Sequence, residues 1–334
     1  MKKRLIGTIA VLAAAGLALA GCSADPLGGD AAAETGGAGS SELTPLSLVV
    51  APIHFEPAYI ADREGYFEEE GLDVEIIRGA DPTSNIARAV SGEVDITTGS
   101  LGTLITSAAA GVPIVTIAGN GYTSPDNPTS GIITLASSDI ETPADLAGRT
   151  VGIQGLNTGS EIPMFLAAED FGIDPLSIER VELASTGMET ALSEGTIDAV
   201  LASAPYYQQL MARDDVHLVS NPSTEYMAGT PVTLWAATKQ WVSDNEDTAA
   251  AFVRAMEKAQ AFYEDPANVD AILDITAEIS EVDRASLTAQ ALIPVSVAID
   301  EAQAGVQAKA FSTYGIVQKP VTIEEILWSG TPLR

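Results

Sequence analysis

The sequence predicts an α/β protein of two lobes, with further helices after the second lobe. Short apolar stretches rich in β-branched residues alternate with stretches of helical spacing over residues 46–237, a pattern typical of α/β domains. Beyond residue 237 only helical spacing remains. A turn-and-strand pattern around Gly92 also recurs around Gly195, and this recurrence indicates two similarly wound lobes. A chain of 334 residues is long enough to hold both.

The composition is that of a globular protein, with 46% hydrophobic and 19% charged residues. The net charge of −30 makes nucleic acids and anionic membrane surfaces poor partners for the body of the protein. Cys22 is the only cysteine, so an intramolecular disulfide is excluded. The two histidines, His54 and His217, lie far apart in the sequence, and we expect His217 at the surface. We expect a monomer with no metal and no cofactor.

The first 21 residues resemble a lipoprotein signal peptide. A basic start at residues 2–4 precedes an apolar stretch at residues 5–20 that is short for a membrane span. The letters LAGC at residues 19–22 resemble a bacterial lipobox, in which the sulfur of Cys22 receives a diacylglyceryl group. The alternative is an ordinary signal peptide with a chance cysteine. Residues 22–45 are rich in small and acidic residues without apolar periodicity, which predicts a flexible tether outside the cytoplasmic membrane.

In the first series of elements, the helices stop at glycines. We expect one helix over residues 58–64, before Gly65, and one over residues 83–91, before Gly92. Ser100 occupies the N-cap position of the helix that ends at Gly111, where its hydroxyl accepts from unpaired backbone N–H groups. The expected strands are residues 46–51, 72–77, 94–98 and 113–118.

A second series begins at residue 131. A short helix over residues 143–148 has proline at its start and glycine at its end. The polar loop at residues 154–160 opens a helix over residues 161–171. The expected strands are residues 131–135, 150–153, 178–183, 197–201 and 216–219, with helices over residues 187–194 and 203–211. A strand over residues 232–237 leads out to helices over residues 248–263, 268–279, 284–292, 301–314 and 323–328.

The internal repeat links the two series. Residues 89–96 read AVSGEVDI and residues 191–200 read ALSEGTIDAV, so both contain the end of a helix, a glycine, an aspartate and an apolar strand. Because helix–glycine–strand turns are common, chance similarity is the alternative. Two related lobes would point the loops after these strands into one crevice, since ligands bind at the carboxyl ends of parallel strands.

Three motifs resemble one protein family. Residues 57–74 contain PAYIA and GYFEEEGLDV, residues 91–96 read SGEVDI before the Gly99-Ser100 loop, and residues 145–152 read DLAGRTVG. In order and spacing they resemble the nitrate/sulfonate/taurine and thiamine-precursor substrate-binding proteins of ABC importers. The resemblance covers about residues 46–328 and is carried by the combination of motifs.

This resemblance implies the type II periplasmic-binding-protein fold, in which two α/β lobes joined by two hinge strands close on a ligand. The implied lobe 1 comprises residues 46–120 and 236–330, and lobe 2 comprises residues 121–235. The hinge strands are expected near residues 118–122 and 232–235.

The loops at the strand ends supply the candidate ligand-binding residues. Phe55 is suited to stack on a planar ligand, and His54 can donate or accept a hydrogen bond near neutral pH. The alternative is that one of these two side chains packs inside its own lobe. Ser100 and Thr103 offer hydroxyls, or simply cap a helix. Trp235 is equally suited to the core, and Glu56 to solvent or to a ligand amine. The full set is His54, Phe55, Ser100, Thr103, Asn120, Tyr122, Gln154, Asn157, Thr158, Ser203, Tyr206 and Trp235.

These loops contain no Lys or Arg. An oxyanion would therefore be held by helix N-termini and hydroxyls rather than by ion pairs, which weakens the case for nitrate. A sulfonate and a neutral heterocycle such as a thiamine pyrimidine precursor both remain open.

We expect a lipid-anchored, non-enzymatic binding protein that delivers a small molecule to an ABC permease. A ligand-presenting sensor is one alternative. An enzyme resembling the thiamine-pyrimidine synthases is another, but it requires a cleft lysine for a pyridoxal cofactor, and the predicted loops hold none.

Overall fold

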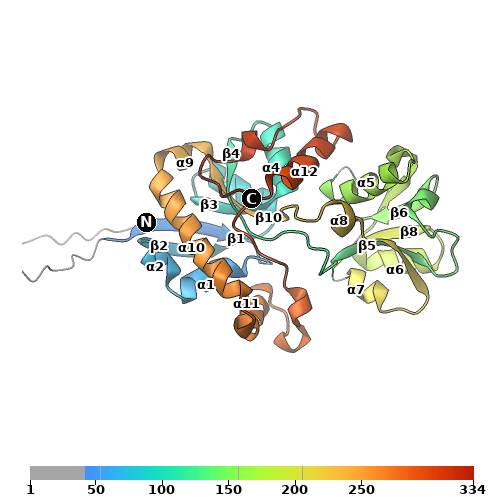
Figure 1. Cartoon of the computed structure of the whole chain (residues 1–334), viewed down its shortest axis with the longest axis horizontal. Coiled ribbons are helices and arrows are strands. Elements are labelled where there is room, and N and C mark those ends of the chain that lie inside the picture. Colours follow the sequence, from blue (N-terminus) through green and yellow to red (C-terminus); the bar gives the residue numbers. More distant parts are fainter. Residues whose placement is uncertain (1–41, 53, 157, 205) are drawn as a thin grey trace, which may run out of the picture. The chain divides into compact units, whose positions relative to one another are not determined.

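The computed structural model describes residues 42–334 except residues 53, 157 and 205 (Figure 1). The predicted signal peptide, Cys22, nearly all of the predicted tether and Asn157 lie outside the described residues. Two five-stranded mixed sheets, each flanked by helices, confirm the predicted α/β class. We call the first sheet with α1–α4 and α9–α11 the first lobe, and the second sheet with α5–α8 the second lobe.

The first sheet has the strand order β2-β1-β3-β10-β4. β1 pairs in parallel with β2 and β3, while β10 returns from the second lobe and runs antiparallel between β3 and β4. Ser100 at the end of β3 is therefore opposite Thr233 at the start of β10. The strands are β1 (Thr44–Val50), β2 (Leu72–Arg78), β3 (Ile96–Ser100), β4 (Ile114–Gly119) and β10 (Thr233–Thr238). β1 thus begins two residues inside the predicted tether.

The second sheet has the order β7-β6-β8-β5-β9 and follows the same plan. β6 is parallel to β7 and β8, and β5 is antiparallel to β8 and β9. Ser203 at the end of β8 is opposite Ser130 at the start of β5. The strands are β5 (Ser130–Leu135), β6 (Thr150–Ile153), β7 (Glu179–Glu182), β8 (Ala199–Ser203) and β9 (Val216–Ser220).

Helices cover both sheets, and among those described none has the length and apolar character needed to cross a membrane. The first lobe has α1 (Glu56–Arg63), α2 (Tyr66–Glu69), α3 (Pro82–Val90), α4 (Leu101–Ala109), α9 (Lys239–Asp244), α10 (Glu246–Glu264) and α11 (Val269–Ser280). The second lobe has α5 (Ile162–Asp170), α6 (Ser185–Ser193), α7 (Tyr206–Met211) and α8 (Pro222–Tyr226), and α12 (Glu301–Thr313) follows late in the chain. Single 3-10 turns are η1 (Pro143–Leu146), η2 (Gly159–Glu161), η3 (Pro175–Ser177), η4 (Pro266–Asn268), η5 (Arg284–Ser286), η6 (Ala289–Ala291) and η7 (Glu324–Ile326).

Two predicted helices are wrong. Residues 284–292 form two separate 3-10 turns because Asp283 caps the first, and the backbone is extended at Leu287 and Thr288. Residues 323–328 form one 3-10 turn, since the N–H of Trp328 leaves the helical pattern and donates to Thr116 O at the edge of β4. The prediction also missed the short helices α2, α8 and α9.

The repeat is confirmed at the level of hydrogen bonds. Gly92 and Gly195 both adopt left-handed backbone angles, with φ of 75° and 66°. A carboxylate oxygen of Asp95 accepts from Ser47 N in β1 at 2.8 Å, and the matching oxygen of Asp198 accepts from Thr150 N in β6 at 2.8 Å. Each aspartate therefore ties the start of the following strand to the neighbouring parallel strand in its own lobe.

The two crossings between the lobes pair with each other. Gly121 O accepts from both Val232 N at 2.7 Å and Thr233 N at 3.2 Å, and Tyr122 forms a bridge with Pro231. No side chain fits at Gly121, because a Cβ there would collide with Ile293 and would lie 2.7 Å from Thr233 Oγ1. The predicted pair of hinge strands is thus present as a short antiparallel ladder.

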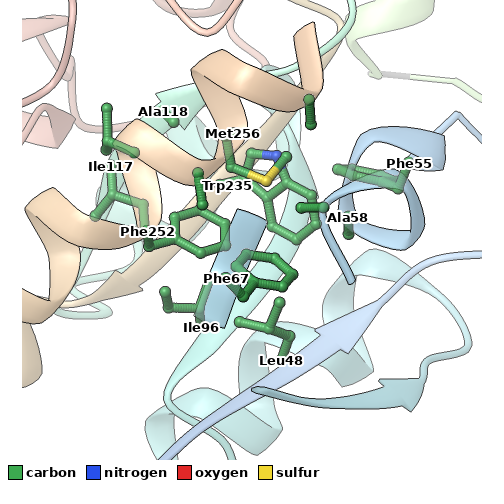
Figure 2. Packing of buried hydrophobic residues seen from close by; sticks show 14 of the residues in the cluster. Leu48, Phe55, Ala58, Phe67, Ile96, Ile117, Ala118, Trp235, Phe252 and Met256 are labelled. Atoms are coloured by element: carbon green, nitrogen blue, oxygen red, sulfur yellow. The ribbon is translucent and has the colours of Figure 1, made fainter. Parts of the chain in front are cut away.

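Aromatic rings join the elements of the first lobe in its core (Figure 2). The Trp235 ring, on β10, meets Phe55 and Phe252 edge-on at centroid distances of 5.0 and 5.3 Å. Phe252 of α10 also stacks on Phe67 of α2 at 6.1 Å. All four side chains are at least 98% buried. This cluster anchors the return strand β10 to α2 and α10, two helices that lie far apart in the sequence.

Replacing Phe252 with alanine should lower the free energy of unfolding by about 3–5 kcal/mol, since it leaves a cavity between Trp235 and Phe67. The matched control is Phe171→Ala, because Phe171 is 46% exposed and its loss should change stability by about 0.5 kcal/mol or less. Urea denaturation followed by tryptophan fluorescence measures both. Equal losses for the two variants would contradict the assigned core.

Candidate functional site

A cleft of about 560 Å³ lies where strand ends and helix starts of both lobes meet, a volume typical of small-molecule sites. The first lobe contributes the start of α4, and the second contributes η2 and the paired ends of β5 and β8. The crossing segments and α12 complete the wall. The polar lining residues are Thr83, Ser100, Thr103, Thr106, Thr123, Ser130, Thr158, Ser160, Ser203, Ser223, Thr230 and Gln307.

Ser100 forms the first-lobe side of the cleft and caps α4. Its Oγ accepts from Thr103 N at 3.1 Å and lies 2.7 Å from Thr103 Oγ1. The other backbone N–H groups at the start of this nine-residue helix carry the positive end of the helix dipole. This side of the cleft therefore suits an electron-rich ligand atom.

The second-lobe side contains an ion pair between a buried carboxylate and a partly exposed arginine. Glu161 is fully buried, accepts from Thr158 N at 3.2 Å and pairs with Arg180 Nη1 at 2.7 Å. The Arg180 guanidinium also lies over the Phe165 ring, 5.2 Å from its centroid. Glu161 thereby fixes the loop that presents the hydroxyls of Thr158 and Ser160, which lie 2.6 Å apart.

Hydroxyl groups dominate the chemistry of the cleft. Eleven of the described lining residues are Ser or Thr, and Gln307 adds one amide. The remaining described lining residues are apolar or glycine, so a ligand meets neutral donors and acceptors. Such a wall offers hydrogen bonds in both directions without a fixed charge to select an anion.

Four of the predicted site residues lie along this cleft: Ser100, Thr103, Thr158 and Ser203. Three of them cap or neighbour a helix start, as the sequence indicated. Their contact with a ligand stays a prediction. Asn157, which directly precedes Thr158 in the chain, lies outside the described residues.

Phe55 and Trp235 require a correction. Both were named as ligand-binding candidates with packing inside the lobe as the alternative, and the structure shows the alternative: Phe55 is 2% exposed and Trp235 is fully buried in the core of the first lobe (Figure 2). Burial of large aromatic surface outweighs a role at the strand end. The strand-end position alone did not reveal the α10 side chains that cover them.

His54, Asn120 and Tyr122 lie at the lobe junction but not among the cleft-lining residues. Asn120 Nδ2 donates to His54 O and to Thr233 Oγ1, so it ties the loop after β1 to the return strand. Burial lowers the pKa of His54, which therefore favours the neutral imidazole. The Tyr122 ring is covered by the Arg334 guanidinium, 4.5 Å from its centroid. These contacts give the three residues structural roles.

Gln154 and Tyr206 also lie outside the cleft lining. Gln154 is exposed, and its amide donates to Ser185 Oγ at 2.7 Å at the start of α6. Tyr206 is half-buried at the first position of α7. His217 is exposed, as predicted.

Sequence reasoning missed most of the hydroxyls and the contribution of α12. Ser130 could have been found from strand order, because it is directly opposite Ser203. Thr123 and Thr230 could have been found from the pairing of the two crossing segments, because Thr123 N donates to Thr230 O at 3.0 Å. No local signal marks Gln307, because its place depends on how α12 docks against distant residues.

Glu56 is the second correction, since its side chain is buried rather than exposed to solvent. It lies at the start of α1, and its Oε1 accepts from Thr276 Oγ1 of α11 at 2.9 Å. Burial raises the pKa of Glu56 more than these hydrogen bonds lower it. Burial, with the nearby Glu56 carboxylate, also raises the pKa of Tyr263.

The comparisons with known proteins agree with this architecture. Residues 53–269 match the family model described as NMT1/THI5 like. The chain belongs to this family. It is 29% identical over 204 residues to the formylaminopyrimidine-binding protein of Halalkalibacterium halodurans, covering 60% of this chain and 59% of that protein. It is 26% identical over 223 residues to a putative thiamine biosynthesis protein of Haemophilus influenzae, covering 66% and 68%.

Solved structures of the family's fold superimpose on most of the chain. The periplasmic aliphatic sulphonate binding protein SsuA of Escherichia coli matches with a TM-score of 0.71 and 16% identity, covering 86% of this chain and 98% of that one. A putative sulfonate ABC transporter protein of Methylobacillus flagellatus, described as a periplasmic sulfonate-binding protein, gives 0.66 and 16%, with 86% and 92% covered. These likenesses confirm the predicted periplasmic-binding-protein fold.

The buried Glu56 leads to a pH-dependent prediction. Because folding raises its pKa above the usual 4.5, its contribution to stability is fully present below pH 4.5 and is lost as the pH rises through the folded-state value. Glu56→Gln should therefore be as stable as the wild type in acid and more stable at neutral pH, as measured by thermal unfolding across pH. Glu64→Gln, at an exposed neighbour, is the control. A Glu56→Gln variant less stable than the wild type at neutral pH would contradict the assignment.

Proposed function

We propose that this chain is an extracytoplasmic substrate-binding lipoprotein of an ABC importer. It captures a small molecule in the cleft between its lobes, closes on it and delivers it to the permease. The hydroxyl-lined cleft that receives groups from both lobes is the observation that carries this proposal. A sulfonate transporter protein with the same fold supports the importer class.

The ligand is a neutral, pyrimidine-like heterocycle rather than a sulfonate or nitrate. A ring with amino groups and ring nitrogens uses both donors and acceptors, and Ser, Thr and Gln side chains supply both. A small anion would instead gain most from bidentate arginine, which the described lining does not offer. The similarity to a formylaminopyrimidine-binding protein supports the same class.

Closure follows from the placement of the hydroxyls on both lobes. A ligand that bonds Ser100 of the first lobe and Thr158 of the second makes more contacts in the closed state, so it binds that state more tightly. The short crossing ladder at Gly121 is the flexible joint between them. The ligand thus drives the change of shape that a permease would recognise.

A pyrimidine synthase is the second candidate, because relatives include proteins named 4-amino-5-hydroxymethyl-2-methylpyrimidine phosphate synthase. The one from Legionella pneumophila is 32% identical over 138 residues, covering 41% of this chain and 42% of that protein. A pyridoxal cofactor would need a lysine in the cleft. The lysines of the described residues are Lys239, Lys258, Lys309 and Lys319, and none of them is among the described cleft lining.

Removing the Ser100 hydroxyl tests the cleft directly. Ser100→Ala should weaken binding of an aminopyrimidine on the order of two- to tenfold, which corresponds to one lost hydrogen bond. Thr238→Ala is the matched control, because Thr238 caps α9 through Trp241 N but does not line the cleft. Both variants should lose about 1 kcal/mol of stability.

Isothermal titration with an aminopyrimidine, an alkanesulfonate and nitrate measures the affinities. Binding that weakens equally in both variants would assign Ser100 a capping role alone. Tight binding of nitrate or the sulfonate, without the aminopyrimidine, would overturn the assigned ligand class.

The lipid anchor is tested at Cys22. The full chain produced in a bacterial host should enter the detergent phase in a phase-partition experiment, and Cys22→Ser should stay in the aqueous phase. Ser23→Ala, which keeps the cysteine, is the control and should behave as the wild type. Wild-type protein in the aqueous phase would reject the anchor while leaving the ligand site untouched.

A further inference from the structure

The helix α12 contacts both lobes at the cleft. On the first-lobe side, Ala304, Ala308 and Phe311 share a buried cluster with residues of α4. On the second-lobe side, Tyr314 just after α12 meets the Phe165 ring of α5 edge-on, with a centroid distance of 4.8 Å. Although this helix lies within the sequence range expected for lobe 1, it bridges the two lobes (Figure 1).

Phe311 lies between the two helix starts that carry the cleft hydroxyls. A Cβ placed on Gly102, in the first turn of α4, would lie 2.9 Å from Phe311 Cζ. A Cβ placed on Gly159, in η2 of the second lobe, would lie 2.7 Å from the same atom and 3.0 Å from Cε2. These Cβ distances are all below normal contact distances, so the edge of the Phe311 ring contacts the backbone of both lobes. Phe311 is 1% exposed, which leaves its ring little room to turn away.

We propose that Phe311 is a spacer that sets the separation between the two hydroxyl-bearing helix starts, and thereby selects the size of the ligand. Gly102 is next but one to Ser100, and Gly159 lies between Thr158 and Ser160. The thickness of one phenyl ring therefore controls how far apart these hydroxyls stand. This inference rests on the proposed binding function, and it gives Phe311, which also lines the cleft, the role of a positioning residue.

The test compares single substitutions of opposite effect. Gly159→Ala adds a methyl group against the ring and should push the helix starts apart, while Phe311→Leu removes the ring edge and should let them approach. The probes are 4-aminopyrimidine and its larger 5-(formylaminomethyl) derivative, measured by titration calorimetry. Gly159→Ala should favour the larger probe and Phe311→Leu the smaller one, each changing the affinity ratio about tenfold.

The two changes together should cancel. Gly159→Ala/Phe311→Leu should return to within about twofold of the wild-type ratio, because the added and removed atoms share one space. Gly305→Ala in α12 is the control, since a Cβ at that position meets nothing within 4 Å. A packing defect without a spacer role would weaken both probes alike and leave the ratio unchanged, which would overturn the proposal.

Failure of the binding function gives a different result. If the wild type binds neither probe, the proposed pyrimidine class is rejected, and crystal structures of the ligand-free wild type and variants then decide the spacer. The spacer predicts a larger separation between the Ser100 and Thr158 hydroxyls in Gly159→Ala, which the double variant restores. A separation equal to that of the wild type in Gly159→Ala would overturn it.

Discussion

The backbone pairing of the two crossing segments is the constraint on which both lobes depend. Gly121 accepts two hydrogen bonds from the returning segment, and neighbouring side chains leave no space for a Cβ at this position. The same junction is hydrogen-bonded to residues 294–297: Tyr122 N donates to Pro294 O, and Ser296 N donates to Asn120 O. With these segments in register, the ends of β3 and β8 both reach the cleft. The ladder thereby fixes where the chain enters and leaves the second lobe.

Each lobe contains an equivalent polar contact in addition to its own buried hydrophobic clusters. Asp95 and Asp198 follow a left-handed glycine and bind the backbone of the neighbouring strand. Asp95 has an additional partner in Trp241 Nε1, at 2.9 Å, where the later helices cover the first lobe. The repeated contact explains why two lobes of different helical cover present their loops in the same way.

Local signals predicted the elements and part of the site. The glycine stops, the Ser100 cap and the repeated aspartates depend on residues close in sequence, so they were readable from the chain alone. The burial of Trp235 and Glu56 was not, because it depends on Phe252 and Thr276 in helices far along the chain. The position of Phe311 likewise depends on two glycines that lie in different lobes. The predicted helix over residues 284–292 is wrong because the Asp283 side chain caps a 3-10 turn and the backbone is extended at Leu287 and Thr288, and the composition of this segment indicates neither feature.

The insertion of one lobe within the other has a consequence for assembly of the chain. To complete the first sheet, Ser100 must pair with Thr233, which closes a loop made of all the residues between them. In an unfolded chain, closing a loop carries an entropic penalty that grows with loop length. The second sheet forms within the intervening residues and pairs Ile132 with Ser220, so that the entry and exit of this lobe lie next to each other. Once that sheet exists, the long loop has become a short one. The folded second lobe thus brings Thr233 close to Ser100, which shortens the loop that must close when β10 pairs between β3 and β4.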